Sequence, residues 1–167
     1  MVTLIVGGAR SGKSSFALKK ATVHKGKKAF IATAQAFDAE MEKRIAKHKT
    51  DRSGDWATLE EPLNLARMIQ NTGDEYSVLL VDCLTLWLSN LMLSGRDADE
   101  AAELLVSAVS SCSADIYLVA NEVGMGIVPD NELARKFRDM AGVLNSKIAE
   151  SADEVYLMAA GIPVKIK

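Results

Sequence analysis

Short continuous apolar runs recur along the chain and are separated by longer segments of mixed polarity. Apolar runs that end at turn residues are typical of strands buried on both faces of a parallel sheet. This pattern predicts strands at 2–6, 29–33, 77–81, 116–120 and 155–159, with a shorter one at 56–59. The last residues, 164–167, follow a Gly-Ile-Pro turn and are expected to form an antiparallel edge strand.

The segments between these runs show helical spacing of apolar residues. They predict helices at 14–24, 38–49, from Pro62 onward, and at 84–93, 97–112 and 131–149. The segment 84–93 is apolar on nearly all sides, which favours a buried helix or one at a subunit interface. Strands alternating with helices predict an α/β fold with a doubly wound, mostly parallel sheet, and the whole chain 1–167 is expected to be one domain.

Composition narrows the classes of function. The formal net charge of -2 argues against a nucleic-acid partner, and the short run 25–28, rich in lysine, is interpreted as a solvated loop. No apolar run reaches the length of a membrane span, and no leader pattern precedes the first strand, so we expect a cytoplasmic protein. Cys83 and Cys112 lie among apolar residues and are expected to be buried free thiols.

The strongest chemical signal follows the first predicted strand. It fits the phosphate-loop pattern G-x-x-x-x-G-K-[ST] at every fixed position, through Gly7, Gly8, Ala9, Arg10, Ser11, Gly12, Lys13 and Ser14. In such a loop, backbone N–H groups surround phosphate oxygens, the lysine reaches the β- and γ-phosphates and the serine hydroxyl binds Mg²⁺. The motif predicts a nucleoside triphosphate but not the reaction.

Four further features are candidates of lower specificity. Asp82 closes the apolar run 77–81 as a metal-binding Walker-B acid does, although a helix-capping Asp would look the same. Ala32, Thr33 and Ala34 leave a strand at the edge where open α/β sheets bind ligands. His48 lies beside the apolar stripe of its helix, where a structural histidine is the commoner case. Two glycines, a proline and an acid give the segment 121–129 the composition of a functional loop.

Several of these stretches together resemble one family. They are the phosphate loop 7–14, Ile-Ala-Thr-Ala at 31–34, the segment around Glu40, Arg44 and His48, Asn-Glu-Val-Gly-Met-Gly-Ile-Val-Pro at 121–129, the residues at 133–139, and the ending 161–167. The sequence resembles, nearly end to end, the bifunctional adenosylcobinamide kinase/adenosylcobinamide-phosphate guanylyltransferase family of cobalamin biosynthesis. The loop at 121–129 and the context of His48 are far more particular to that family than the phosphate loop.

The resemblance implies a RecA-like P-loop NTPase fold and two reactions. ATP or GTP phosphorylates adenosylcobinamide, a corrinoid. GTP then guanylylates His48, and the GMP passes to adenosylcobinamide phosphate. The resemblance also implies Mg²⁺ held by Ser14 and Asp82, a homotrimer, and nucleotide contacts from Lys49, Thr50, Asp51, Arg52, Glu60 and Asp82. Glu60 has the chemistry to accept hydrogen bonds from guanine.

Three other readings compete with this one. In a monofunctional P-loop small-molecule kinase, His48 would be structural and no covalent GMP adduct would form. A GTP-binding switch would need an Asn-Lys-x-Asp motif, but Glu122 occupies the lysine position. A nucleic-acid motor subunit is disfavoured by the charge and the length of the chain.

Overall fold

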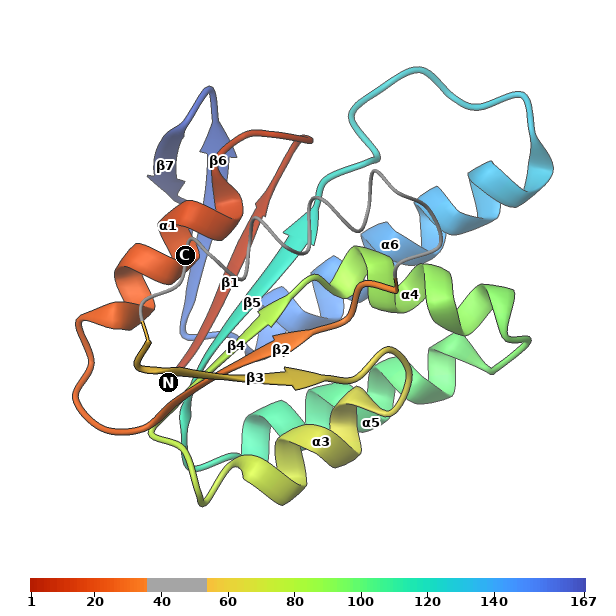
Figure 1. Ribbon diagram of the computed structural model, residues 1–167. Coiled ribbons are helices and arrows are strands. Elements are labelled where there is room, and N and C mark those ends of the chain that lie inside the picture. The colour runs from red at the N-terminus through yellow and green to blue at the C-terminus, as the bar shows by residue number, and fades with distance from the viewer. Residues whose placement is uncertain (36–53) are drawn as a thin grey trace.

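The computed structural model describes residues 1–35 and 54–167 (Figure 1). The predicted helix 38–49, with His48, and the candidate nucleotide contacts at 49–52 lie outside the described residues. Within the described part of the chain, no helix is long and apolar enough to span a membrane.

A seven-stranded sheet forms the centre of the molecule, in the order β3-β2-β4-β5-β1-β6-β7. Its strands are β1 (Val2–Gly7), β2 (Lys28–Ala32), β3 (Trp56–Glu60), β4 (Val78–Asp82), β5 (Asp115–Asn121), β6 (Glu154–Ala159) and β7 (Ile162–Lys165). Among the strand pairs of the described residues, only that of β6 with β7 is antiparallel. The mostly parallel sheet and the antiparallel edge strand at the C-terminus confirm the predicted fold class.

Strand β5 lies between β1, which leads into the phosphate loop, and β4, which ends at Asp82. In RecA-like P-loop NTPases, one strand is inserted between the strand that leads into the phosphate loop and the strand that ends at the Walker-B acid. The order β4-β5-β1 has this arrangement. Gly7 pairs with Asn121, and Asp82 with Val119, so β1, β5 and β4 end at the same edge of the sheet. That edge carries the phosphate loop predicted from the sequence and Asp82, the candidate Walker-B acid.

Helices cover both faces of the sheet (Figure 1). Helix α1 (Lys13–Thr22) packs Ala17 and Ala21 on one face, over Ile5, Phe30 and Tyr117. The other face bears the larger core, which includes residues of α3 (Leu65–Thr72), α4 (Leu84–Leu93), α5 (Ala98–Ser111) and α6 (Glu132–Ser151). Strands β1, β4 and β5 are buried on both faces along most of their length, which is why they read as continuous apolar runs.

The prediction that a helix begins at Pro62 is wrong, because α3 begins at Leu65. The carboxylate of Glu61 accepts hydrogen bonds from the backbone N–H groups of Leu63 and Asn64, at 2.9 and 2.7 Å. The carbonyls of Pro62 and Leu63 accept hydrogen bonds from Asn90 and Trp87 of α4. These contacts hold the segment against α4 in a turn, which local propensity could not reveal.

The sequence predicts that the segment 84–93 is either a buried helix or a helix at a subunit interface. In the structure, α4 is a buried helix. Trp87, Leu88 and Leu91 are at most 2% exposed and belong to the chain's own core. Cys83, which precedes the helix, is a buried free thiol as predicted, whereas Cys112 is a free thiol that is only half-buried. The lysine run is also only partly a solvated loop, because Lys28 is buried and begins β2.

Candidate nucleotide-binding site

The phosphate loop connects β1 to α1 through backbone conformations that depend on glycine. A Cβ added at Gly7 would lie 2.6 Å from the carbonyl oxygen of Met158, so β1 and β6 approach too closely there for a side chain. Gly12 has a φ of 90° and is the N-cap of α1, with no side-chain cap on the helix. The first N–H groups of α1 therefore have no capping side chain and are suited to bind an anion.

Lys13 is folded back over this loop. Its ammonium donates a hydrogen bond to the carbonyl oxygen of Gly8 at 2.6 Å and contacts the hydroxyl oxygen of Ser11 at 3.5 Å. Only 7% of the residue is exposed, and burial lowers its pKa, while the nearby Cys83 and Asp82 act in the opposite direction. A cation kept out of water and bonded mainly to neutral oxygens is well placed to bind phosphate.

Thr33 joins the ends of β2 and β4 beside the loop. Its hydroxyl donates to the carbonyl oxygen of Cys83 at 2.7 Å and accepts from the Cys83 N–H at 2.8 Å. Its own carbonyl accepts a hydrogen bond from the Asn90 side chain. Thr33 is fully buried, so its hydroxyl fixes the backbone next to Asp82 and does not face solvent. Burial raises the pKa of the Cys83 thiol to about 11, which keeps this thiol neutral and unreactive at pH 7.

The loop that follows β5 begins in contact with the phosphate loop. The Glu122 N–H donates to the carbonyl oxygen of Gly7 at 2.9 Å, and the Asn121 N–H donates to the Thr85 hydroxyl at 2.6 Å. The sequence predicts a functional loop here, but it does not reveal which residues hold that loop against the phosphate loop. Those partners come from β1 and α4, which are far away in the sequence.

Comparison with known proteins identifies the family. The family model described as "Cobinamide kinase / cobinamide phosphate guanyltransferase" matches residues 3–166. The chain belongs to this family. It is 45% identical over 169 residues to the bifunctional adenosylcobalamin biosynthesis protein CobP of Pseudomonas aeruginosa, an alignment that covers all of this chain and 98% of that protein. It is 41% identical over 183 residues to the bifunctional adenosylcobalamin biosynthesis protein CobU of Salmonella typhimurium, with all of both chains covered.

A solved structure supports the fold independently. The flagellar accessory protein FlaH from Methanocaldococcus jannaschii superposes with a TM-score of 0.57 at 13% identity, covering 99% of this chain and 77% of that one. At this identity the likeness concerns the fold alone.

The structure brings some of the predicted site residues of this family member together and leaves others apart. The phosphate loop, Ala32, Thr33, Ala34 and Asp82 lie at the carboxyl edge of the sheet. Glu60 is exposed at the same edge but ends β3, four strand positions from β1, or about 19 Å at the usual strand spacing. A nucleotide that reached both the phosphate loop and Glu60 would have to lie extended along this edge.

The donor set beside the loop fits Mg²⁺. Ser14 supplies a half-buried hydroxyl in the first turn of α1, and Asp82 supplies a half-buried carboxylate whose charge acts on Lys13. Two hard oxygen donors are typical of a magnesium site completed by water and substrate phosphates. No cluster of three or more His, Cys, Asp or Glu that could hold a metal occurs among residues 1–35 and 54–167.

Proposed function

We propose that this chain phosphorylates adenosylcobinamide with ATP or GTP and then transfers GMP from GTP to the phosphate that it has made. The observation that carries the proposal is full-length similarity, at 45% and 41% identity, to relatives that are named bifunctional. The complete phosphate loop around the buried Lys13 supports it. A kinase with only the first activity would be the alternative, and the bifunctional relatives disfavour it.

In the first reaction, the hydroxyl oxygen of the corrinoid's aminopropanol arm attacks the γ-phosphorus. The bond from that phosphorus to the bridging oxygen breaks, a nucleoside diphosphate leaves, and the hydroxyl proton passes to solvent or a carboxylate. Lys13 and the N-terminal N–H groups of α1 stabilise the charge that develops on the phosphates. Mg²⁺ held by Ser14 and Asp82 would neutralise part of the same charge.

In the second reaction, a neutral imidazole nitrogen of His48 attacks the α-phosphorus of GTP, and pyrophosphate leaves. The resulting P–N bond preserves the reactivity of the GMP group, and the ring proton is lost to solvent. A phosphate oxygen of adenosylcobinamide phosphate then attacks the same phosphorus. The P–N bond breaks, the leaving imidazole nitrogen takes up a proton from solvent so that neutral His48 is regenerated, and adenosylcobinamide-GDP is formed. One phosphate loop thus serves both reactions.

The proposal includes the remaining family features. Lys49, Thr50, Asp51, Arg52 and Glu60 contact the nucleotide, with Glu60 accepting from guanine, and the protein acts as a cytoplasmic homotrimer. The buried apolar residues of α4 lie in the chain's own core, so they are not available for a trimer contact. A mass of three chains by light scattering tests the assembly.

The decisive experiment uses GTP labelled at the α-phosphorus, with Mg²⁺ and no corrinoid. The protein is expected to acquire an acid-labile, base-stable label, and addition of adenosylcobinamide phosphate should discharge it. His48→Ala should abolish labelling while phosphorylation of adenosylcobinamide persists, because transfer of the γ-phosphoryl group does not use the imidazole.

His24→Ala is the matched control, since His24 is the only other histidine of the chain. It lies after the C-terminal end of α1 and bonds to Asp115 and Tyr117 at the opposite edge of the sheet. Labelling should survive this change. Normal labelling of His48→Ala would refute the assignment, and a wild-type protein that phosphorylates but takes up no label would be a monofunctional kinase.

A further inference from the structure

We propose that the segment 123–128 after β5 and the adjoining outer stripe of α6 form the seat of the corrinoid acceptor. We call this surface the β5–α6 ledge. The inference rests on the proposed function, because only an acceptor of that class requires such a surface. It assigns the acceptor to residues that neither the phosphate-loop motif nor the family match specifies.

The backbone of the ledge is fixed at both ends. At its start, the Glu122 N–H donates to the carbonyl oxygen of Gly7 in β1 at 2.9 Å, and the Glu122 carboxylate accepts a hydrogen bond from the Gly124 N–H at 2.6 Å. At its end, the Arg135 guanidinium donates to the carbonyl oxygens of Pro129 and Asp130 at 3.0 and 2.6 Å. Asn131 caps α6 directly after it through a hydrogen bond from the Ala134 N–H. The loop is therefore anchored at both ends to the fold.

Between these anchors the loop presents large apolar side chains to solvent. Ile127 is 97% exposed, Met125 80% and Val128 58%. The loop arches beyond the carboxyl edge of the sheet, on the same edge as the phosphate loop (Figure 1). Apolar side chains gathered on an anchored loop beside an active site are typical of a surface that is covered when a ligand binds.

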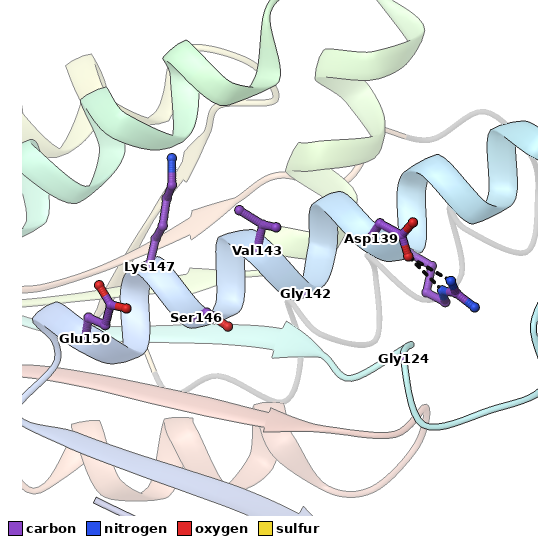
Figure 2. A pocket seen from close by; sticks show the side chains of 8 residues that line it. Gly124, Asp139, Gly142, Val143, Ser146, Lys147 and Glu150 are labelled. Atoms are coloured by element: carbon purple, nitrogen blue, oxygen red, sulfur yellow. Dashed lines mark hydrogen bonds and ion pairs between the residues drawn. The ribbon is translucent and has the colours of Figure 1, made fainter.

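Beside the start of this loop, the outer stripe of α6 presents polar groups of both signs, and Gly124 is the loop residue that lines the groove along the helix. Figure 2 shows Gly124 beside the helix, with Asp139, Gly142, Ser146 and Glu150 along it. These residues line an open groove of about 780 Å³. Asp139 pairs with Arg138 at 2.8 Å, and Lys147 pairs with Glu103 of α5 at 3.3 Å. The charges are thus largely balanced, and the stripe offers both donors and acceptors.

This chemistry matches a corrinoid better than it matches an anion. A corrinoid is a broad macrocycle with apolar faces and a rim of neutral carboxamides, each of which both donates and accepts hydrogen bonds. An apolar loop suits the ring, and a charge-balanced polar stripe suits the rim. A nucleic acid or a free phosphate would instead select a cationic groove.

Position favours the acceptor over a second copy of the chain as the occupant. Glu122 bonds to Gly7 of the phosphate loop, and Gly124 follows two residues later, within about 7 Å of extended chain. The acceptor hydroxyl must reach the γ-phosphate, so part of the corrinoid has to lie beside this loop. The groove then extends along α6 for about 18 Å from Arg138 to Glu150, which leaves room for the macrocycle away from the phosphates.

Two variants test the ledge without weakening the core. Met125→Ser combined with Ile127→Ser removes the exposed apolar contacts. Gly142→Trp fills the groove from the helix, where an added Cβ would meet nothing within 4 Å. Leu104→Ser is the matched control, because Leu104 is 55% exposed on α5 and does not line the groove.

Binding of cobinamide is measured by equilibrium dialysis through its visible absorbance, together with KM for adenosylcobinamide. Both ledge variants should raise Kd and KM about 10-fold or more. In Met125→Ser with Ile127→Ser this is the loss expected when one or two large apolar contacts disappear. In Gly142→Trp the indole occupies space that the acceptor would otherwise fill. Labelling by α-labelled GTP, which needs no acceptor, should stay within twofold of wild type, as should kcat at saturating acceptor. The assembly mass should not change. Leu104→Ser should behave as wild type.

Unchanged Kd and KM in both ledge variants would overturn the proposal. A fall in assembly mass would also overturn it, because the ledge would then be covered by a second copy. Loss of GTP labelling in the variants would place the ledge in the nucleotide site and equally refute an acceptor seat. Failure of the proposed function itself is distinct, since the wild-type protein would then take up no label while the dialysis still decides whether the ledge binds the corrinoid.

Discussion

Charged side chains have different partners at the amino and the carboxyl edges of the sheet, the edges where the parallel strands begin and end. At the amino edge, charged side chains are paired with one another. Glu154 at the start of β6 bonds to Lys20 and Lys165 at 2.9 and 2.7 Å, and the ring of His24 lies between Asp115 and Tyr117 at 2.9 and 2.6 Å. These contacts join α1, β5, β6 and β7 and close that edge of the fold.

At the carboxyl edge, the principal cation is held by neutral backbone. The Lys13 ammonium bonds to the carbonyl oxygen of Gly8, in a loop that needs glycine at Gly7 and Gly12. Burial disfavours the charged form of this lysine, whereas the bonds to Glu154 raise the pKa of Lys20. Charges at the amino edge therefore stabilise the fold, while Lys13 at the carboxyl edge is kept available for phosphate.

The largest effect that this comparison predicts comes from Lys13→Ala. Loss of the ammonium should reduce both phosphorylation and GTP labelling by about 100-fold or more, because both reactions develop charge on phosphates in the same loop. The melting temperature should not fall, since a poorly solvated cation is removed. Lys19→Ala, at an exposed position of the same helix, is the control and should leave both activities intact. Loss of only one activity would require two nucleotide sites.

A smaller effect is expected from Thr33→Val at the carboxyl edge. The change leaves the buried Cys83 N–H without the Thr33 hydroxyl that now accepts from it, which typically costs about 1–3 kcal/mol. The melting temperature should fall by about 2–4 °C per kcal/mol in a chain of this size. Phosphorylation should fall several-fold as the backbone beside Asp82 shifts. Thr33→Ser keeps the hydroxyl and should restore most of both losses, whereas equal losses in the two variants would contradict the assigned role.

The smallest effect concerns pH and the amino edge. The pKa of Glu154 is lowered from its ordinary value of 4.5 to about 2. The largest cause is the hydrogen bond from Lys165, followed by the one from Lys20. Because the folded-state pKa is lowered, this carboxylate stabilises the fold above about pH 4.5, and that contribution is lost as the pH falls toward 2.

Glu154→Gln should therefore lower the melting temperature at pH 7 by about 1–3 °C, the scale of a partly exposed ion-pair network, and should matter progressively less as the pH falls below 4.5. Both activities at pH 7 should be unaffected. A difference from wild type that grows as the solution is acidified would show the sign to be wrong.

Much of the fold could be predicted because the signals are local. Buried parallel strands appear as apolar runs, and the phosphate loop reveals its turn through the glycines and lysine of 7–14. The start of α3 was missed because its turn depends on Asn90 and Trp87 of another helix. Likewise, the place of Thr33 after a predicted strand is only a weak indication of a site residue. Its hydrogen bond to Cys83, 50 positions away in the sequence, could not be predicted.

The candidate site divides in the same way. Lys13 and Asp82 carry motif signals and lie at one edge, whereas the groove beside Gly124 and Gly142 forms only when β5 and α6 are folded together. The roles of His48 and its neighbours at 49–52 rest on the family and remain predictions.

If one phosphate loop serves both reactions, each chain binds a single nucleotide, and the stoichiometry of nucleotide binding decides this. Equilibrium dialysis of a β,γ-methylene analogue of GTP against the His48→Ala protein should give one bound nucleotide per chain. The corresponding ATP analogue should displace all of it, with the same affinity that it shows as an inhibitor of phosphorylation. Two bound nucleotides per chain, or a GTP analogue that the ATP analogue cannot displace, would contradict the account.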